Sequence, residues 1–191
     1  MLEKIPSSAG RALGSVRAGP ENLVFNDAAL ARVPERIDVW SPAFIDGGTI
    51  PERFTTDGPG TSPPLQWRGA PLTTAELVLL IEDPDAPLPH PLVHAIVWQL
   101  RGASGSIAEG TLSTTGGQKP DLPLSRNAYW VREYLPPDPP AGHGTHHYAF
   151  ELFALDARPR FESAPGRSTL LEILKEHAIA KGMLVGTYER R

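Results

Sequence analysis

The sequence contains no cysteine, which excludes disulfide bonds and thiolate chemistry and leaves the redox compartment open. It also lacks an apolar run of the roughly 18 residues that a membrane-spanning helix needs. Residues 1–19 have scattered charges and no apolar core of signal-peptide length. We therefore expect a cytoplasmic protein without integral membrane association.

A surplus of positive charge is missing as well. The 18 Lys and Arg residues are outnumbered by 22 Asp and Glu residues, which gives a net charge of −4. Such a chain has no general field for nucleic acid or for an anionic membrane, so we expect no nucleic-acid partner. An anion that it binds must be held by local hydrogen-bond donors.

Common catalytic and metal-binding motifs are also missing. No H-E-x-x-H or H-x-H spacing occurs, and the candidate Asp and His ligands lie on distant segments. No G-x-S-x-G motif of a serine hydrolase is present. We expect no bound metal, no cofactor and no catalytic residues.

Proline and glycine are abundant instead. The 191 residues include 21 prolines and 18 glycines without a collagen-like period, which indicates many fixed turns between short elements. The length fits one domain with appendages. Residues 1–36 are expected to form an N-terminal extension that is helical or packed on a partner, and residues 37–191 to form the folded domain.

Apolar patterning predicts a mainly β fold, an antiparallel sandwich of two sheets. The expected strands lie in 37–44, 77–81, 92–100, 146–155 and 183–188. Residues 101–128 are rich in Gly, Ser and Thr and are expected to form a long connection with weak structure. One late helix is expected, because Thr169 and Glu172 have capping-box spacing and Gly182 is placed to stop it.

Ionisable side chains lie at the ends of two predicted buried strands. Asp83 and Asp85 follow the first of these strands in "EDPDAP", and His146 and Tyr148 begin a later one. Because alternate residues of a strand share a face, His146 and Tyr148 should project together and His147 should point away. The two segments predict a small pocket with polar donors.

His94 lies near the start of a third predicted strand, on the same face as Ile96 and Trp98 by simple alternation. An imidazole there needs a hydrogen-bond partner, and Asp83 is the expected one. A structural role remains an alternative for His94 and for the Asp-Pro turn. His90 and His143 are expected to be solvated, and His177 to pack on the helix.

Three motifs in order resemble the phosphatidylethanolamine-binding protein family, in its bacterial Raf kinase inhibitor-like branch. They are "DGPGTSPPLQW", "EDPDAP" followed by "VHAIVW", and "PPDPPAGHGTHHYAFELFALD", within Ser41 to Tyr188. The resemblance implies a β-sandwich with a helix near the C-terminus and short peripheral helices, and an anion pocket at one end. The ligand-binding residues that it implies are Asp83, Asp85, Pro87, His94, His146 and Tyr148.

The resemblance also implies functions. Family members are described as binding phospholipid head groups or phosphorylated ligands and as modulating kinases. The leading hypothesis is therefore a binding or regulatory protein for a small phosphorylated or anionic ligand. The alternatives are an inhibitor of a protease or kinase that acts through its surface, and a hydrolase that uses the same Asp and His residues. A homodimer is compatible with the resemblance. Leu135 and Ala95 depart from the family pattern at the pocket.

Overall fold

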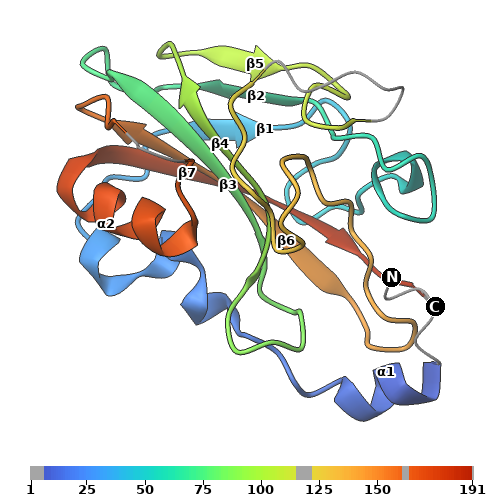
Figure 1. The fold of residues 1–191 in the computed structure, drawn as a ribbon. Helices are drawn as coiled ribbons and strands as arrows, with labels where there is room; N and C mark the ends of the chain where they lie inside the picture. Colours follow the sequence, from blue (N-terminus) through green and yellow to red (C-terminus); the bar gives the residue numbers. More distant parts are fainter. Residues whose placement is uncertain (1–6, 115–121, 161–163, 191) are drawn as a thin grey trace.

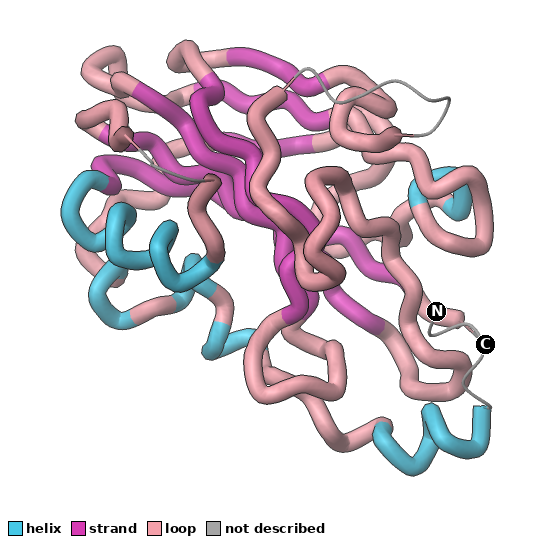
Figure 2. Tube along the Cα trace, viewed as in Figure 1, coloured by secondary structure: helices cyan, strands magenta, loops and turns pink. Residues whose placement is uncertain are grey.

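The computed structural model describes residues 7–114, 122–160 and 164–190, which form two antiparallel sheets and a helical layer (Figures 1 and 2). The strands are β1 (Asp38–Trp40), β2 (Leu65–Arg68), β3 (Glu76–Asp83), β4 (Leu92–Leu100), β5 (Gly105–Ile107), β6 (His146–Leu155) and β7 (Ala178–Tyr188). The helices are α1 (Ser7–Leu13) and α2 (Arg167–His177), with 3-10 turns η2 (Pro20–Asn22), η3 (Val24–Asn26), η4 (Ala28–Leu30) and η5 (Glu52–Phe54).

The predicted sandwich is confirmed. The larger sheet has the strand order β4-β3-β6-β7, and the smaller sheet has the order β1-β2-β5. All strand pairs in both sheets are antiparallel. The prediction for residues 101–128 was too simple, because β5 lies within them and pairs with β2. β5 has only three residues, one of which is glycine, so it is too short to show an alternating apolar pattern.

β3 is the central strand, and all eight of its residues are buried. Leu77, Leu79 and Ile81 face the core between the two sheets. Val78 and Leu80 face a second core on the other side of the larger sheet. The strand therefore has an unbroken apolar run because it is covered on both faces.

The second core lies between the larger sheet and the helical layer. Phe25 of η3 and Leu30 of η4 are buried there together with Leu170 and Leu174 of α2. Figure 1 shows the blue N-terminal turns beside α2. The N-terminal segment thus contributes to the interior of the molecule, while the domain boundary before Ile37 stays a prediction.

The C-terminal helix exists, but the predicted signals for its ends were wrong. α2 follows Gly166, which has no side-chain cap, and Thr169 lies inside the helix. Gly182 does not stop the helix, because the chain enters β7 directly at Ala178. A Cβ at Gly182 would lie 1.9 Å from the carbonyl oxygen of Ile37. Glycine is present there because two backbones approach closely, and β7 is longer than the predicted last strand.

Two buried carboxyl groups tie the N-terminal turns to the larger sheet. The amide of Val24 donates to Glu82 and the amide of Phe25 donates to Glu151, both at 3.0 Å. Arg167 Nε donates to Glu82 at 2.6 Å. Burial, with the charge of Glu82 adding to it, raises the pKa of Glu151 well above its usual value. The protonated form of Glu151 is therefore favoured in the folded protein.

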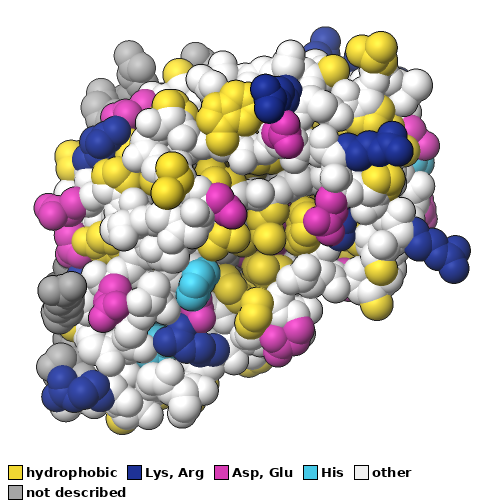
Figure 3. All heavy atoms as spheres, turned by 180° about the vertical axis from the view of Figure 1, so that it is seen from behind, with side chains coloured by type: hydrophobic (Ala, Val, Ile, Leu, Met, Phe, Trp, Pro, Cys, Tyr) yellow, Lys and Arg dark blue, Asp and Glu magenta, His cyan; other side chains and the backbone are white. Residues whose placement is uncertain are grey.

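The surface carries charges of both signs. On the face shown in Figure 3, basic and acidic side chains are interspersed around hydrophobic side chains near the centre. In the described ranges, no helix is both long and apolar enough to span a membrane.

Candidate functional site

A small cavity of about 20 Å³ lies where β3, β4 and β6 meet their loops. Four of the six predicted site residues line it, namely Asp83, Pro87, His94 and His146. The other lining residues are Ala86, Leu92, Tyr129, Leu135, Pro136 and Asp138. Tyr148 packs against His94 behind this lining, and Asp85 lies outside it. We call this site the small cavity.

His94 does not share a face with Ile96 and Trp98, which corrects the prediction from simple alternation. The partners of Ile81 and Glu82 on β4 are Ala95 and Val93, so His94 is the additional residue of a β-bulge. Its ring packs edge-on against Tyr148 with the centroids 5.2 Å apart. The bulge therefore turns the imidazole from the helical layer to the small cavity.

The sequence predicted that Asp83 orients His94, but a backbone carbonyl does so instead. Its Nδ1 lies 2.6 Å from the oxygen of Leu135. A carbonyl can only accept, so Nδ1 carries the proton. Burial lowers the pKa of His94 and favours the neutral ring. The Nε2 atom is then a hydrogen-bond acceptor, and it is buried without a partner in the described part of the chain.

Asp83 instead holds His146. Its Oδ2 lies 2.7 Å from His146 Nδ1, and its Oδ1 accepts the amide of Asp85 at 2.7 Å. The other ring nitrogen of His146 lies 2.7 Å from Nδ1 of His143. Both nitrogens of His146 are thus used inside the protein, so it does not offer the free donor that we expected.

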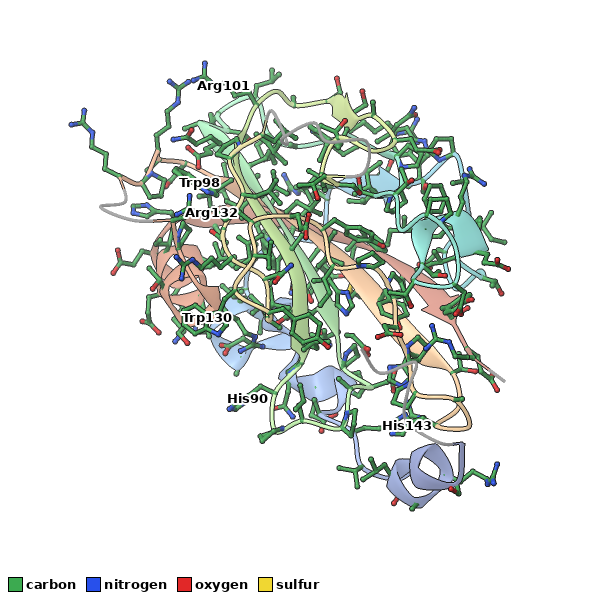
Figure 4. All side chains as sticks on the ribbon, turned by 45° about the vertical axis from the view of Figure 1, so that its right-hand side comes forward. His90, Trp98, Arg101, Trp130, Arg132 and His143 are labelled. Carbon is green, nitrogen blue, oxygen red and sulfur yellow. The ribbon has the colours of Figure 1, made fainter. Side chains whose placement is uncertain are left out.

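His143 was expected to be solvated, but it is buried, with 3% of its surface exposed. Its Nε2 lies 2.9 Å from the carbonyl oxygen of Leu13, the last residue of α1. Figure 4 shows His143 next to α1. His143 lies in a glycine-rich loop, and no local pattern indicates that a distant segment covers it.

The number of protons limits the chain of hydrogen bonds through His143 and His146. Three bonds link two imidazoles to two acceptors, the oxygen of Leu13 and the carboxylate of Asp83. Two neutral imidazoles carry one N–H each, so they can supply only two of the three protons. All three bonds can therefore form together only with one further proton in this set, and burial lowers the pKa of His143, which acts against that proton.

Asp85 lies outside the small cavity and binds Arg17 of the N-terminal segment. It accepts from Arg17, and its Oδ2 lies 2.7 Å from His147 Nδ1. Burial acts to raise the pKa of Asp85, but hydrogen bonds from His147 and Arg17 lower it overall. Arg17 also donates to the carbonyl oxygens of Thr145 and His143, at 3.0 and 3.1 Å. The exposed position of His147, opposite His146, agrees with the predicted alternation.

Asp138 is a lining residue that the sequence did not single out. It accepts from Arg190 at 2.8 Å and from the hydroxyl of Thr56 at 2.9 Å. Its partners lie far from it in the sequence, Thr56 after η5 and Arg190 after β7. Only the fold brings these groups together.

Comparisons with known proteins agree with the architecture. A family model described as phosphatidylethanolamine-binding protein matches residues 40–189. UPF0098 protein Rv1910c of Mycobacterium tuberculosis is 40% identical over 168 residues, which cover 85% of this chain and 78% of that protein.

Two solved structures have the same fold. The homologue CT736 of Chlamydia trachomatis superimposes with a TM-score of 0.72 and 32% identity, covering 82% of this chain and 99% of that chain. YbcL of E. coli superimposes with a TM-score of 0.71 and 22% identity, covering 82% of this chain and 99% of that chain. At this identity the similarity shows the fold alone. Because the family model matches residues 40–189, which are most of the sequence, this chain belongs to the phosphatidylethanolamine-binding protein family.

Proposed function

We propose that the small cavity binds one small oxyanion, the phosphoryl group of phosphate or of a phosphomonoester, and that the protein binds this ligand without turning it over. The observation that carries the proposal is the unpartnered Nε2 of His94. A buried polar atom without a partner is costly, and His94 is one of the side chains that line the cavity. A ligand that pairs with Nε2 removes this cost.

The charges around the cavity favour a monoanion that carries a proton. Asp83 and Asp138 line the cavity, and each is already paired, Asp83 with His146 and Asp138 with Arg190. No surplus of positive charge is therefore left for a dianion. Because Nε2 of neutral His94 is an acceptor, either the ligand donates a P–OH proton to it or His94 becomes protonated when the anion binds.

The cavity must widen to admit a phosphoryl group. Its volume of about 20 Å³ is close to that of a single water site, for which roughly 10–15 Å³ is enough. Tyr129 lines the cavity and is 42% exposed, so its side chain can move into solvent at little cost in buried area. We expect Tyr129 to be displaced on binding.

The test is a titration of the ¹⁵N-labelled protein with inorganic phosphate and with a phosphomonoester, phosphoethanolamine. We expect shifts at Asp83, His94 and Tyr129 in the wild type and their loss in His94→Ala. His90→Ala is the matched control, because His90 is exposed in the loop before β4, as the sequence predicted. Equal shifts in His94→Ala and the wild type would contradict the proposal.

Kinase modulation, inhibition through the surface, a homodimer and a cytoplasmic location remain predictions. The hydrolase hypothesis has its own test in a screen of phosphomonoesters and carboxylic esters. Turnover that is lost in Asp83→Asn would favour hydrolysis over simple binding.

A further inference from the structure

A second and much larger cavity lies beside the small one. Its volume is about 570 Å³, within the range of roughly 300–1,000 Å³ typical of small-molecule sites. Leu92 borders both cavities. The lining residues are Leu88, Pro91, Leu92, Val93, Ile96, Arg126, Asn127, Ala128, Trp130, Arg132, Ala164, Pro165, Gly166 and Arg167. We call this site the large cavity.

The floor of the large cavity is apolar and fixed. Leu92, Val93 and Ile96 come from β4, the edge strand of the larger sheet. Residues 123–128 run along this edge, where Ser125 donates to the oxygen of Ile96 and Ala128 donates to that of Val93, both at 2.9 Å. These bonds hold the wall at a set distance from the floor, so the cavity is a built feature rather than a gap between loose segments.

The charges at the large cavity are all of one sign. Three arginines line it, and no acidic residue is among its lining residues in the described part of the chain. Arg167 is occupied by Glu82 and by the oxygen of Asn22. Arg126 and Arg132 form no ion pair with another described residue. In a protein with a net charge of −4, this local excess favours an anionic ligand.

Trp130 is held out over this site by a strained turn. Its φ angle is 64°, in the left-handed region that side chains other than glycine rarely adopt. The side-chain oxygen of Asn127 accepts the amides of Tyr129 and Val131, at 2.9 and 3.2 Å, and so fixes the turn. The tryptophan is left 75% exposed, with the guanidinium of Arg126 at 5.6 Å from its ring. Strain of this kind persists where the surrounding contacts impose it, and it is concentrated at ligand sites.

We propose that the large cavity binds an amphiphilic carboxylate, a molecule with one acid group and an apolar body. The acid group pairs with Arg126 and Arg132, since a guanidinium matches a carboxylate with two parallel hydrogen bonds. The apolar body lies on the β4 floor and is covered by Trp130. Figure 4 shows Trp130 and Arg132 on the same side of the molecule as α2. An acyl chain and an aromatic body share this chemistry, and the experiment separates them.

The test is isothermal titration calorimetry with dodecanoate, with 2-naphthoate and with the neutral alcohol dodecanol, each below its aggregation limit. We expect the wild type to bind at least one of the two carboxylates and, where dodecanoate binds, to bind dodecanol at least tenfold more weakly. Tighter binding of dodecanoate would identify an acyl chain as the apolar body of the ligand, and tighter binding of 2-naphthoate would identify an aromatic one. No binding of either carboxylate at 1 mM, or equal affinities for dodecanoate and dodecanol where both bind, would overturn the proposal.

Matched variants locate the site. The double variant R126Q/R132Q and the variant Trp130→Ala should each weaken carboxylate binding at least tenfold, with circular dichroism spectra unchanged. The controls are Arg68→Gln and Trp40→Ala, because Arg68 lies 5.7 Å from the ring of Trp40 in an equivalent pair on the smaller sheet. Wild-type affinity in R126Q/R132Q would exclude the site. His94→Ala should retain carboxylate binding, so this result is independent of the phosphate proposal.

Discussion

The imidazole of His143 contacts the imidazole of His146, with Nδ1 of the first 2.7 Å from Nε2 of the second. His146 lines the small cavity and is held by Asp83, while His143 is bound by the carbonyl oxygen of Leu13. One chain of hydrogen bonds therefore joins the wall of the cavity to the N-terminal segment. This segment precedes residue 40, where the family match begins.

Removal of Arg17 should loosen this connection. Arg17→Ala removes the arginine donor from Oδ1 of Asp85 and from the carbonyl oxygens of His143 and Thr145, while Oδ2 of Asp85 keeps His147. We expect the free energy of unfolding in urea to fall by about 1–3 kcal/mol, as for other buried or partly buried hydrogen-bond partners. The amide of His143 should also exchange faster with solvent.

The control for Arg17 is Arg68→Ala, because Arg68 forms a more exposed pair with Asp38 at 2.9 Å. A surface pair contributes up to about 1 kcal/mol, so this variant should stay close to the wild type. Equal losses in the two variants would show that Arg17 acts only as a surface charge.

Glu151 should make the stability of the wild type depend on pH. Its pKa is raised in the folded protein by burial and by Glu82, against the opposing charges of Arg167 and Lys181. As the pH rises above the pKa of the unfolded chain, the unfolded state ionises while the folded state keeps the proton, and stability is lost. We expect wild-type stability to fall from pH 4.5 to pH 8 relative to Glu151→Gln, which can still accept from Phe25.

Urea unfolding of both proteins at several pH values measures this difference. Parallel pH profiles for Glu151→Gln and the wild type would contradict the assignment of a raised pKa to Glu151.

Gly182 should not tolerate a side chain. A Cβ there would meet the backbone oxygen of Ile37 at 1.9 Å, and backbone atoms cannot rotate away. We expect Gly182→Ala to lower the free energy of unfolding by about 3 kcal/mol or more, the upper end of overpacking effects. In Gly166→Ala the new Cβ has nothing within 4 Å, and we expect a loss of at most about 1 kcal/mol. Similar thermal midpoints for the two variants would refute this explanation.

The sandwich could be predicted because its main strands are continuous apolar runs. β6 begins and ends at the predicted residues, and β3 and β4 contain the predicted runs. β5 could not be predicted, because three residues at a sheet edge carry no pattern of their own. Gly182 was misread because a glycine required by a close backbone contact looks, in sequence, like a glycine that ends a helix.

The candidate site was predicted in its composition but not in its pairing. Asp83, His94 and His146 do meet at one cavity. Asp83 was assigned to the wrong histidine, because the backbone oxygen of Leu135 already pairs with Nδ1 of His94. The predicted face of His94 was wrong as well, because one bulge residue changes the face on which it lies. The contribution of Leu13 could not be foreseen, since a backbone carbonyl has no signature in the sequence.

The most direct test of the central claim measures protons taken up when the small cavity is filled. Burial lowers the pKa of His94 in the free protein, and a bound anion favours the protonated ring or brings its own proton. Titration calorimetry with inorganic phosphate in two buffers of different ionisation enthalpy, at pH 6 and pH 8, counts these protons. We predict weaker binding at pH 8, uptake of up to about one proton, and loss of both effects in His94→Ala. Phosphate binding with no proton uptake and equal affinity at both pH values would contradict the account.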